Sequence, residues 1–450
     1  MKKLFINARL VDRDTNKNGA LFVNKENIEK VFFNLNDSEF LQLQQDATIE
    51  KIDVQGNVLM PSFIDVHTHL RNPGQSQKET IESYVNAAVA GGFGVTVAMP
   101  NTNPIISSMK LAKSVQDECA SFNKCDVIQV VSLTKDFAGT GTSHLDTLEG
   151  FPMTSEDGRD VSSADTMLEA MKKCGKKDIV VSCHCEEEAH SVHSKPLRAK
   201  AIEMLKDYLP SDWGKLTKET TSIDLDTIDK CFSEANEFLR TSEDVATERN
   251  IELARQANCH VHIDHASTVK TMELIKAGKK IMGDKVTCEV TPHHISLTSD
   301  NQGFFRYIVN PPIRTNKDRL SLIEGIKDGT VDCIATDHAP HTLADKQSGS
   351  PGFSGLETSF AVSYTELVAT GIIDLSKLSA LMSANPAKII KKNTLGLLKE
   401  GYRANLTIID EKAEWIIDSS TFKSKGAVCP FEGKLVKSRV LKTFYNGYEK

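Results

Sequence analysis

Residues 61–74 read PSFIDVHTHLRNPG, a short apolar run that ends in two histidines, His67 and His69. The run is typical of a buried strand that leads into a polar loop. Residues i and i+2 of a strand point to the same side, so both imidazoles can bind one metal ion. Two histidines at a strand end also occur without any metal, and the spacing alone leaves both interpretations open.

Seven further apolar runs follow, and amphipathic helical stretches such as residues 78–90 and 245–257 lie between them. The eight runs are residues 63–70, 94–101, 126–134, 150–155, 178–186, 258–267, 285–295 and 331–341, of which 150–155 is the weakest strand prediction. Strands that alternate with helices eight times predict an α/β protein with a (β/α)8 TIM barrel. Residues 187–244 are long for a single connection, so we predict a helical excursion there.

Both ends of the chain differ from this pattern. Segments such as residues 4–12 and 404–418 are rich in β-branched residues and show no long helical period. We therefore predict a smaller β-rich lobe formed by the N- and C-terminal segments, residues 1–58 and 399–450. The barrel is then residues 59–398.

Composition excludes several classes of protein. The 450 residues carry 54 basic and 61 acidic side chains, a formal charge of −7, which gives no general affinity for nucleic acid or for an anionic membrane. A run of about 18 apolar residues, as a membrane span requires, is absent from the sequence. The N-terminal run is interrupted before it could form a signal peptide. Ten cysteines without a CxxC pair fit a reducing compartment, so we predict a cytoplasmic enzyme.

Polar residues that can bind a metal fall at the ends of the predicted strands. His184 ends the fifth run, His265 the sixth and Asp337 the eighth. The carboxyl ends of barrel strands meet at one mouth, so we expect these side chains to lie beside His67 and His69. Imidazole and carboxylate ligands suit Zn²⁺ and similar divalent cations.

A site for two metals also needs a bridging anion. Asp157 is a candidate, in the sequence Ser155-Glu156-Asp157-Gly158 after the fourth run. An Asp-Gly pair is a very common turn, and on spacing alone an ordinary turn is the favoured interpretation.

The remaining residues near these strands are expected to be structural. His260 and His262 share the strand phase that excludes His265, so we expect them to face the helices. Cys183 and Cys185 flank His184 and are expected to pack on the face opposite to it.

Seven motifs cover the barrel region. They are PSFIDVHTHLRNPG (61–74), AMPNTNP (98–104), SCHCEE (182–187), HIDHAST (262–268), EVTPHHISLTSD (289–300), NPPIR (310–314) and CIATDHAPH (333–341). In these motifs the chain resembles the amidohydrolase superfamily, and more closely the class I dihydroorotases. The ends, GYRANLTIID (401–410) and PFEGKLVKSRVLKTFYNG (430–447), resemble the β-lobe of that family. The resemblance covers nearly the whole chain and is weakest over residues 187–244.

The resemblance implies two Zn²⁺ ions, or similar divalent cations, in each subunit. His67 and His69 match the ligands of the first metal, and His184 and His265 those of the second. Asp337 matches the aspartate that contacts the first metal and transfers the proton.

The resemblance also changes the interpretation of Asp157. The turn Glu156-Asp157-Gly158 matches the Asp-Asp-Gly turn of bacterial class I enzymes, whose second acidic residue bridges the metals. Other branches of the superfamily use a carboxylated lysine instead. Lys135, after the third run, is the candidate for that role and ranks below Asp157.

The activity implied is the reversible, metal-dependent cyclisation of N-carbamoyl-L-aspartate to L-dihydroorotate in de novo pyrimidine (UMP) biosynthesis. Arg71, Asn101 and His341 match residues that hold the carboxylate of the substrate, and Asn310 matches one that contacts the ring. A guanidinium can bind a carboxylate through two hydrogen bonds, which favours dihydroorotate over uncharged rings. Residues 342–355, rich in Gly and Ser, suit a mobile lid.

Two alternatives stay open. The first is a dihydropyrimidinase, hydantoinase or allantoinase, which predicts a carboxylated lysine and no such role for Arg71. The second is a catalytically silent amidohydrolase-like scaffold, which would be expected to lose metal ligands. A homodimer is common in the family, and a complex with an aspartate transcarbamoylase is a further prediction.

Overall fold

A ring of parallel strands forms the centre of the computed structural model, which describes residues 2–213, 215–300 and 308–450. In chain order the strands are β6 (Phe63–Thr68), β7 (Phe93–Ala98), β8 (Asp126–Gln129), β9 (Val131–Ser132), β10 (Met153–Ser155), β11 (Val180–Cys183), β12 (Val261–Ile263), β13 (Val286–Val290) and β14 (Cys333–Ile334). The third predicted run divides, because β8 pairs with β7 whereas β9 pairs with β10. A parallel bridge between Thr68 and His338 joins the last strand to the first. The predicted (β/α)8 barrel is confirmed. Its weakest predicted strand, residues 150–155, corresponds to β10.

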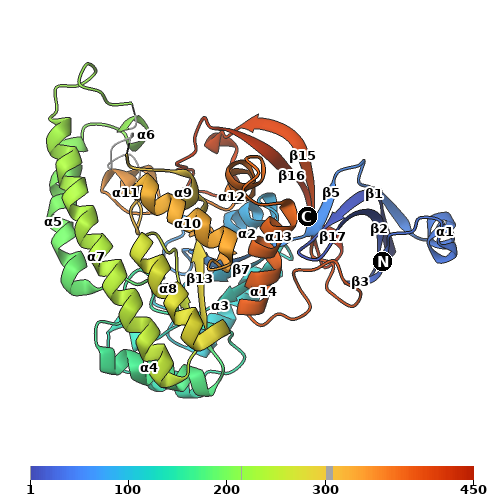
Figure 1. Cartoon of the computed structure of the whole chain (residues 1–450), viewed down its shortest axis with the longest axis horizontal. Coiled ribbons are helices and arrows are strands. Elements are labelled where there is room, and N and C mark those ends of the chain that lie inside the picture. The colour runs from blue at the N-terminus through green and yellow to red at the C-terminus, as the bar shows by residue number, and fades with distance from the viewer. Residues whose placement is uncertain (1, 214, 301–307) are drawn as a thin grey trace.

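Amphipathic helices cover the outside of the ring (Figure 1). They include α2 (Ile81–Ala90), α3 (Met109–Ser121), α4 (Ala164–Lys176), α7 (Leu225–Ala257), α8 (Val269–Met282) and α10 (Asn316–Asp328). Five of these six helices begin at a Ser or Thr whose hydroxyl accepts a backbone N–H, and α7 begins at Asp224 in the same way. Their apolar faces and the outward faces of the strands form one buried cluster, which includes Cys183 and Cys185 as predicted.

Shorter helices complete the barrel end of the chain. They are α9 (Pro292–Ser296), α11 (Leu343–Gln347), α12 (Ser359–Ser363), α13 (Leu375–Ser379) and α14 (Asn385–Ile389). Among the described residues, no helix is apolar for long enough to cross a membrane.

The predicted helical excursion is a long hairpin (Figure 1). Helix α5 (Glu188–Leu205) leads through α6 (Pro210–Trp213) to α7, and α5 and α7 pack side by side. Trp213, Phe232 and Ile308 belong to the apolar cluster at the end of this hairpin, so the hairpin is bound to the segment that precedes Asn310.

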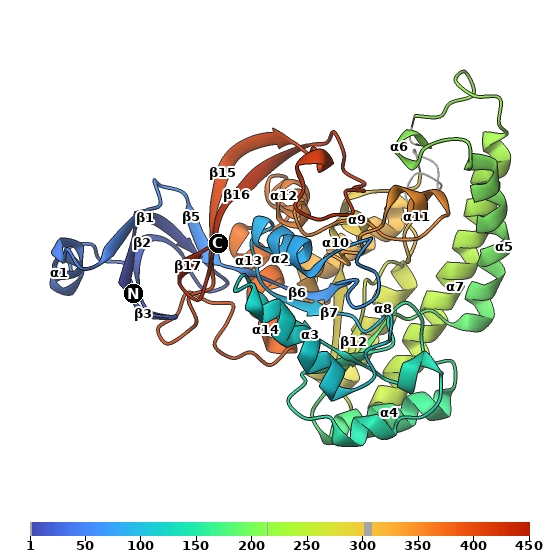
Figure 2. The same ribbon diagram turned by 180° about the vertical axis from the view of Figure 1, so that it is seen from behind.

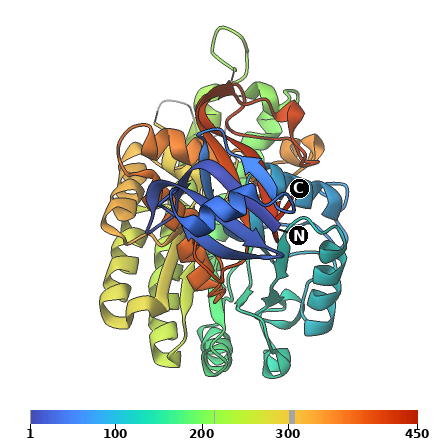
Figure 3. The same cartoon turned by 90° about the vertical axis from the view of Figure 1, so that its right-hand side faces the viewer.

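The β-rich lobe projects from one side of the barrel (Figures 2 and 3). Its sheet has the order β17-β16-β15-β5-β1-β2-β3, with β4 paired to β1. The elements are β1 (Lys2–Val11), β2 (Asn16–Asn24), β3 (Asn27–Phe32), α1 (Ser38–Gln45), β4 (Glu50–Asp53), β5 (Val58–Pro61), β15 (Leu406–Ile416), β16 (Leu435–Tyr445) and β17 (Tyr448–Glu449). Strand β5 pairs with β1 and with β15, which joins the two ends of the chain in one sheet. The exact division at residues 58/59 and 398/399 stays a prediction.

Candidate metal centre

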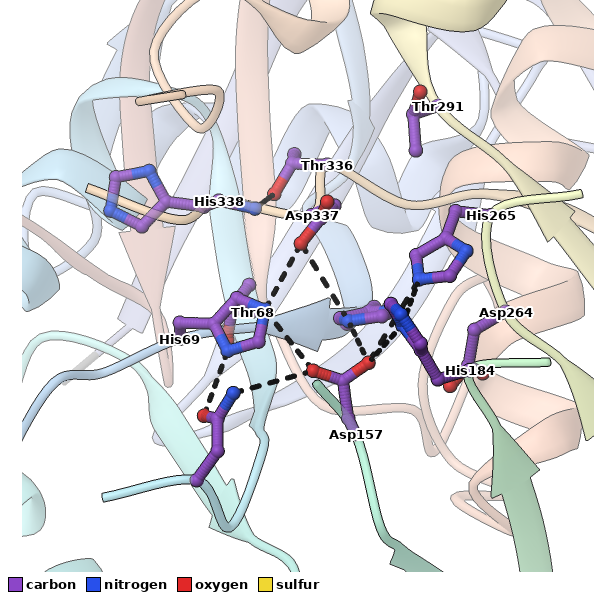
Figure 4. A network of polar contacts seen from close by, with 12 residues as sticks. Thr68, His69, Asp157, His184, Asp264, His265, Thr291, Thr336, Asp337 and His338 are labelled. Atoms are coloured by element: carbon purple, nitrogen blue, oxygen red, sulfur yellow. Dashed lines mark hydrogen bonds and ion pairs between the residues drawn. The ribbon is translucent and has the colours of Figure 1, made fainter. Parts of the chain in front are cut away.

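The six predicted metal ligands meet at the carboxyl ends of the barrel strands, although up to 270 residues separate them in the chain (Figure 4). They are His67, His69, Asp157, His184, His265 and Asp337, and all six are buried. Figure 4 shows Asp157 between His69, which follows β6, and His184 and His265, which follow β11 and β12.

Asp157 is the common member of two ligand groups. One consists of His67, His69 and Asp157, the other of Asp157, His184 and His265. Oδ1 of Asp157 lies 3.3 Å from Nε2 of His67 and 3.1 Å from Nδ1 of His184, whereas its Oδ2 lies 3.4 Å from Nε2 of His69. Oδ1 therefore lies beside a member of each group, and one carboxylate contacts both groups, as a bridging ligand requires. Lys135 is exposed and belongs to neither group.

The ring nitrogens of these histidines lie close to one another as well as to Asp157. Nδ1 of His184 and Nε2 of His265 lie only 2.9 Å apart, and both lie within 4 Å of the same oxygen of Asp157. Nε2 of His67 is buried and makes no hydrogen bond within the described residues. Imidazole nitrogens that converge on one buried carboxylate are a donor set that fits divalent cations of the Zn²⁺ type.

The electrostatics of the site are dominated by its two aspartates. Burial alone would raise the pKa of Asp157, but the charge of His67 and hydrogen bonds from His184 and His265 lower it well below its ordinary value. Burial likewise opposes ionisation of Asp337, yet a hydrogen bond from His69 and the nearby histidines hold its pKa far below the usual range. Both carboxylates are therefore anions at neutral pH, although no solvent reaches them freely.

Three site residues have an unusual backbone. Arg71, His265 and Asp337 have φ values of 62°, 32° and 47°, in a region that residues other than glycine rarely adopt. Each lies two or three residues beyond the end of its strand, and the turn redirects its side chain into the mouth. Strand alternation therefore does not apply to His265. The expectation for His260 and His262 rested on that alternation.

That expectation is wrong for His262. Its Nε2 lies 3.2 Å from Oε2 of Glu289, and the other oxygen of Glu289 lies 2.8 Å from Nδ1 of His67. His262 is thus buried beneath the ligand cluster and does not face the helices. Sequence reasoning missed Glu289, although it stands in the motif EVTPHH within the predicted run 285–295.

Asn101 also contacts the cluster directly. Its Oδ1 lies 2.9 Å from Nδ1 of His69, and its amide donates a long hydrogen bond of 3.5 Å to Asp157. With Nδ1 of His69 bound in this way, Nε2 faces Asp337 at 3.0 Å. Asn101 therefore orients a ligand as well as lining the mouth.

A cavity of about 220 Å³ opens above the cluster. It is smaller than a pocket for a drug-sized molecule, roughly 300–1,000 Å³, and suits one small ring. All the predicted substrate residues line it, namely Arg71, Asn101, His341 and Asn310, together with Ser350, Pro351 and Gly352. A larger surface groove, of about 440 Å³, runs along β16 and α12 and has none of these residues in its lining.

The cationic side of this cavity is built by Arg71. Its guanidinium is buried, donates to the carbonyl of Pro340 at 3.2 Å and lies 3.1 Å from Nε2 of His341. Burial lowers the pKa of Arg71 to about 10, so it stays a cation at neutral pH. Burial and the adjacent cations Arg71 and Lys78 lower the pKa of His341 to about 2, so His341 is neutral.

The opposite side of the cavity holds Asn310. Its Oδ1 accepts a hydrogen bond of 2.6 Å from Arg198 of α5, and its amide lies 3.4 Å from Glu186. Glu186 in turn lies 3.3 Å from Nε2 of His184. Arg198 comes from the region where the sequence showed the weakest resemblance, and it was not predicted.

Comparisons with known proteins agree with this geometry. The model of the amidohydrolase family matches residues 58–449. The chain is 35% identical to a dihydroorotase of Clostridium botulinum, over 99% of this chain and 98% of the other. It is also 35% identical to a dihydroorotase of Aquifex aeolicus, over 99% of both chains.

Solved structures share the fold at lower identity. An L-hydantoinase (dihydropyrimidinase) from Arthrobacter aurescens superposes with a TM-score of 0.82 at 22% identity, over 99% of this chain and 95% of the other. A dihydropyrimidinase from Brevibacillus agri has a TM-score of 0.80 at 19% identity, over 100% and 95%. The match of the family model and the full-length relatives, rather than these distant structures, establish that the chain belongs to the amidohydrolase family, in the group of the dihydroorotases.

Proposed function

We propose that the chain is a dihydroorotase, which converts N-carbamoyl-L-aspartate reversibly to L-dihydroorotate in pyrimidine biosynthesis, with two Zn²⁺ or similar ions bound. Full-length identity to dihydroorotases supports the reaction. The assignment of the substrate rests on the buried guanidinium of Arg71, which lines the same small cavity as the His/Asp cluster. A buried, charged fork is costly without an anion, and a substrate carboxylate supplies one.

In this proposal His67 and His69 would hold the first cation and His184 and His265 the second, and Asp157 would be a ligand shared by both. Such cations lower the pKa of water to near neutrality and polarise a carbonyl group. The remaining chemistry belongs to the side chains of this protein.

Asp337 is suited to move the proton. It is ionised, it lines the cavity, and its Oδ1 lies 3.0 Å from Nε2 of His69. In the hydrolytic direction its carboxylate accepts the proton of the attacking water and delivers it to the ring nitrogen as the amide bond breaks. In the direction of cyclisation the same proton moves the opposite way.

Substrate binding is assigned to the cavity walls. Arg71 and the neutral His341 hold the carboxylate, with Asn101 beside them, and Asn310 contacts the ring from the opposite side. The hydrogen bond from Arg198 to its Oδ1 and the contact of its amide with Glu186 orient Asn310.

The test is turnover of the zinc-loaded protein on dihydroorotate, dihydrouracil and allantoin, each with and without a chelator. We expect chelator-sensitive activity on dihydroorotate alone. Activity on an uncharged ring would instead favour a dihydropyrimidinase, hydantoinase or allantoinase. Metal binding without activity on any of the three would favour the silent scaffold.

We also propose a location in the cytoplasm, which the ten free cysteines support, nine of them buried. The homodimer and the complex with an aspartate transcarbamoylase stay predictions. Light scattering of the purified protein, alone and mixed with that partner, checks both.

A further inference from the structure

Lys346 is a lysine buried without an acidic partner. It lies on α11 with only 3% of its surface exposed, and within the described part of the chain it forms no ion pair. Its Nζ donates three hydrogen bonds to backbone carbonyls, at 2.8 Å to Ile308, 2.9 Å to Ser350 and 2.9 Å to Gly352. The ring of Phe353 lies 4.8 Å from the same nitrogen.

These three carbonyls belong to two segments that form one side of the substrate cavity. Ser350 and Gly352 line it directly, and Ile308 lies two residues before Asn310, which lines it as well. A backbone hydrogen bond of 3.1 Å from Gly352 to Ile308 joins the same two segments. The ammonium of Lys346 is thus the point at which both segments are held together.

The same arrangement reaches the carboxylate side of the cavity. The carbonyl of Pro351, between the two residues that Lys346 binds, lies 2.8 Å from Nε2 of His341. His341 is in turn 3.1 Å from Arg71. Displacement of residues 350–352 would therefore move the group that positions His341, whereas the metal ligands do not contact Lys346.

An ammonium ion satisfies this arrangement. It has three N–H groups for three carbonyls, whereas an apolar side chain would leave the three acceptors buried and unpaired. Burial, with Arg198 and Arg71 nearby, lowers the pKa of Lys346 to about 7. Burial of a cation without an acidic partner costs free energy, and packing of the apolar stem alone does not require the charged end.

We propose that Lys346 is a positioning residue for substrate binding, which holds residues 350–352 and the segment before Asn310 at the spacing that the substrate needs. The proposal rests on the proposed function for its substrate. It also changes the interpretation of residues 342–355: α11 and Lys346 attach this segment to the cavity wall, and movement as a lid requires that the three hydrogen bonds break.

Substitution of Lys346 by Met tests the proposal, because Met keeps the apolar stem and removes the three donors. The KM for dihydroorotate is expected to rise roughly tenfold or more, while kcat changes less than about threefold and zinc content stays unchanged. Hydrogen exchange of the amides of Gly349, Ser350 and Gly352 is expected to become faster. Lys388→Met, at an exposed lysine, is the matched control and should change neither quantity.

Chemical rescue distinguishes positioning from general loss of structure. In Lys346→Ala, added ethylammonium can refill the space that the side chain leaves, and KM is expected to fall toward the wild-type value. If Lys346→Met does not fold, Lys346→Gln, which retains two N–H donors, replaces it. The same changes in KM and in hydrogen exchange are then expected, but they should be smaller.

Two results would overturn the proposal. One is an unchanged KM with a kcat that falls only in proportion to the folded fraction, and the other is unchanged exchange of residues 349–352. If the wild-type protein itself fails to turn over dihydroorotate, the proposed function is wrong. The exchange measurement still decides whether Lys346 holds the cavity wall.

Discussion

Oε1 of Glu289 lies 2.8 Å from Nδ1 of His67, and neither side chain is exposed to solvent. The same oxygen accepts a hydrogen bond of 3.2 Å from the backbone N–H of His265. One carboxylate of β13 therefore contacts a histidine from each of the two ligand groups. It directs Nε2 of His67 toward Asp157, as carboxylates behind metal-bound histidines do.

Glu289→Gln should weaken metal binding. The substitution keeps the shape of the side chain but removes the charge that holds the ring of His67, and loss of such a contact costs about 10- to 100-fold in metal affinity. Competition for zinc against a chromophoric chelator measures this. Glu252→Gln, at an exposed glutamate of α7, is the control. Equal zinc affinities in the three proteins would contradict the role given to Glu289.

Asp157→Ala should abolish the binding of two metals and the activity together, because Asp157 is the common member of both ligand groups. Lys135→Ala should leave both nearly intact, since Lys135 is exposed and lies outside these groups. Metal content by elemental analysis, beside turnover of dihydroorotate, gives the comparison. The opposite pattern would assign the bridge to a carboxylated lysine.

The sequence predicted the barrel and the meeting of the ligands because both depend on local patterns. Each short apolar run is a strand, and in a barrel the strand ends share one mouth. His184 and Asp337 are brought together by this rule alone. The pattern could not assign Asp157, because an Asp-Gly turn looks the same with or without a metal. Resemblance to a family, rather than spacing, indicated that residue.

The parts that the sequence did not predict depend on contacts across the fold. Glu289 contacts His67 over 222 residues, and no periodicity links the two. His265 has a φ of 32° beyond the end of β12, so strand alternation gave the wrong orientation for His262. Arg198 and Lys346 contact residues of the cavity wall from helices, where a charged residue ordinarily indicates a solvated face.

The stability of the protein should depend on His260 between about pH 6.5 and pH 4. Burial lowers the pKa of His260 from 6.5 to about 4, so the unfolded chain binds more protons than the folded one in this range. Stability is therefore retained above pH 6.5 and lost as the pH falls toward 4. The loss attributable to this group is at most about 3 kcal/mol.

His260→Gln removes this titration but keeps a donor for Thr287, which lies 2.9 Å from Nε2. Urea unfolding of the metal-free proteins should show that the variant gains about 2 kcal/mol relative to wild type between pH 7.5 and pH 4.5. A difference that is the same at both pH values would show that His260 is not buried in its neutral form.

Arg71→Met should weaken the binding of dihydroorotate more than it slows the chemical step. The variant keeps most of the apolar stem but loses the charged fork, and charge-assisted hydrogen bonds contribute about 1.5–3 kcal/mol each. We expect the KM for dihydroorotate to rise roughly 10- to 100-fold, while kcat and zinc content stay close to the wild-type values. Arg439→Met, at an exposed arginine of β16 far from the cavity, is the control. Steady-state kinetics on dihydroorotate decides the matter, since a lower kcat with an unchanged KM would mean that Arg71 supports the loop and not the carboxylate.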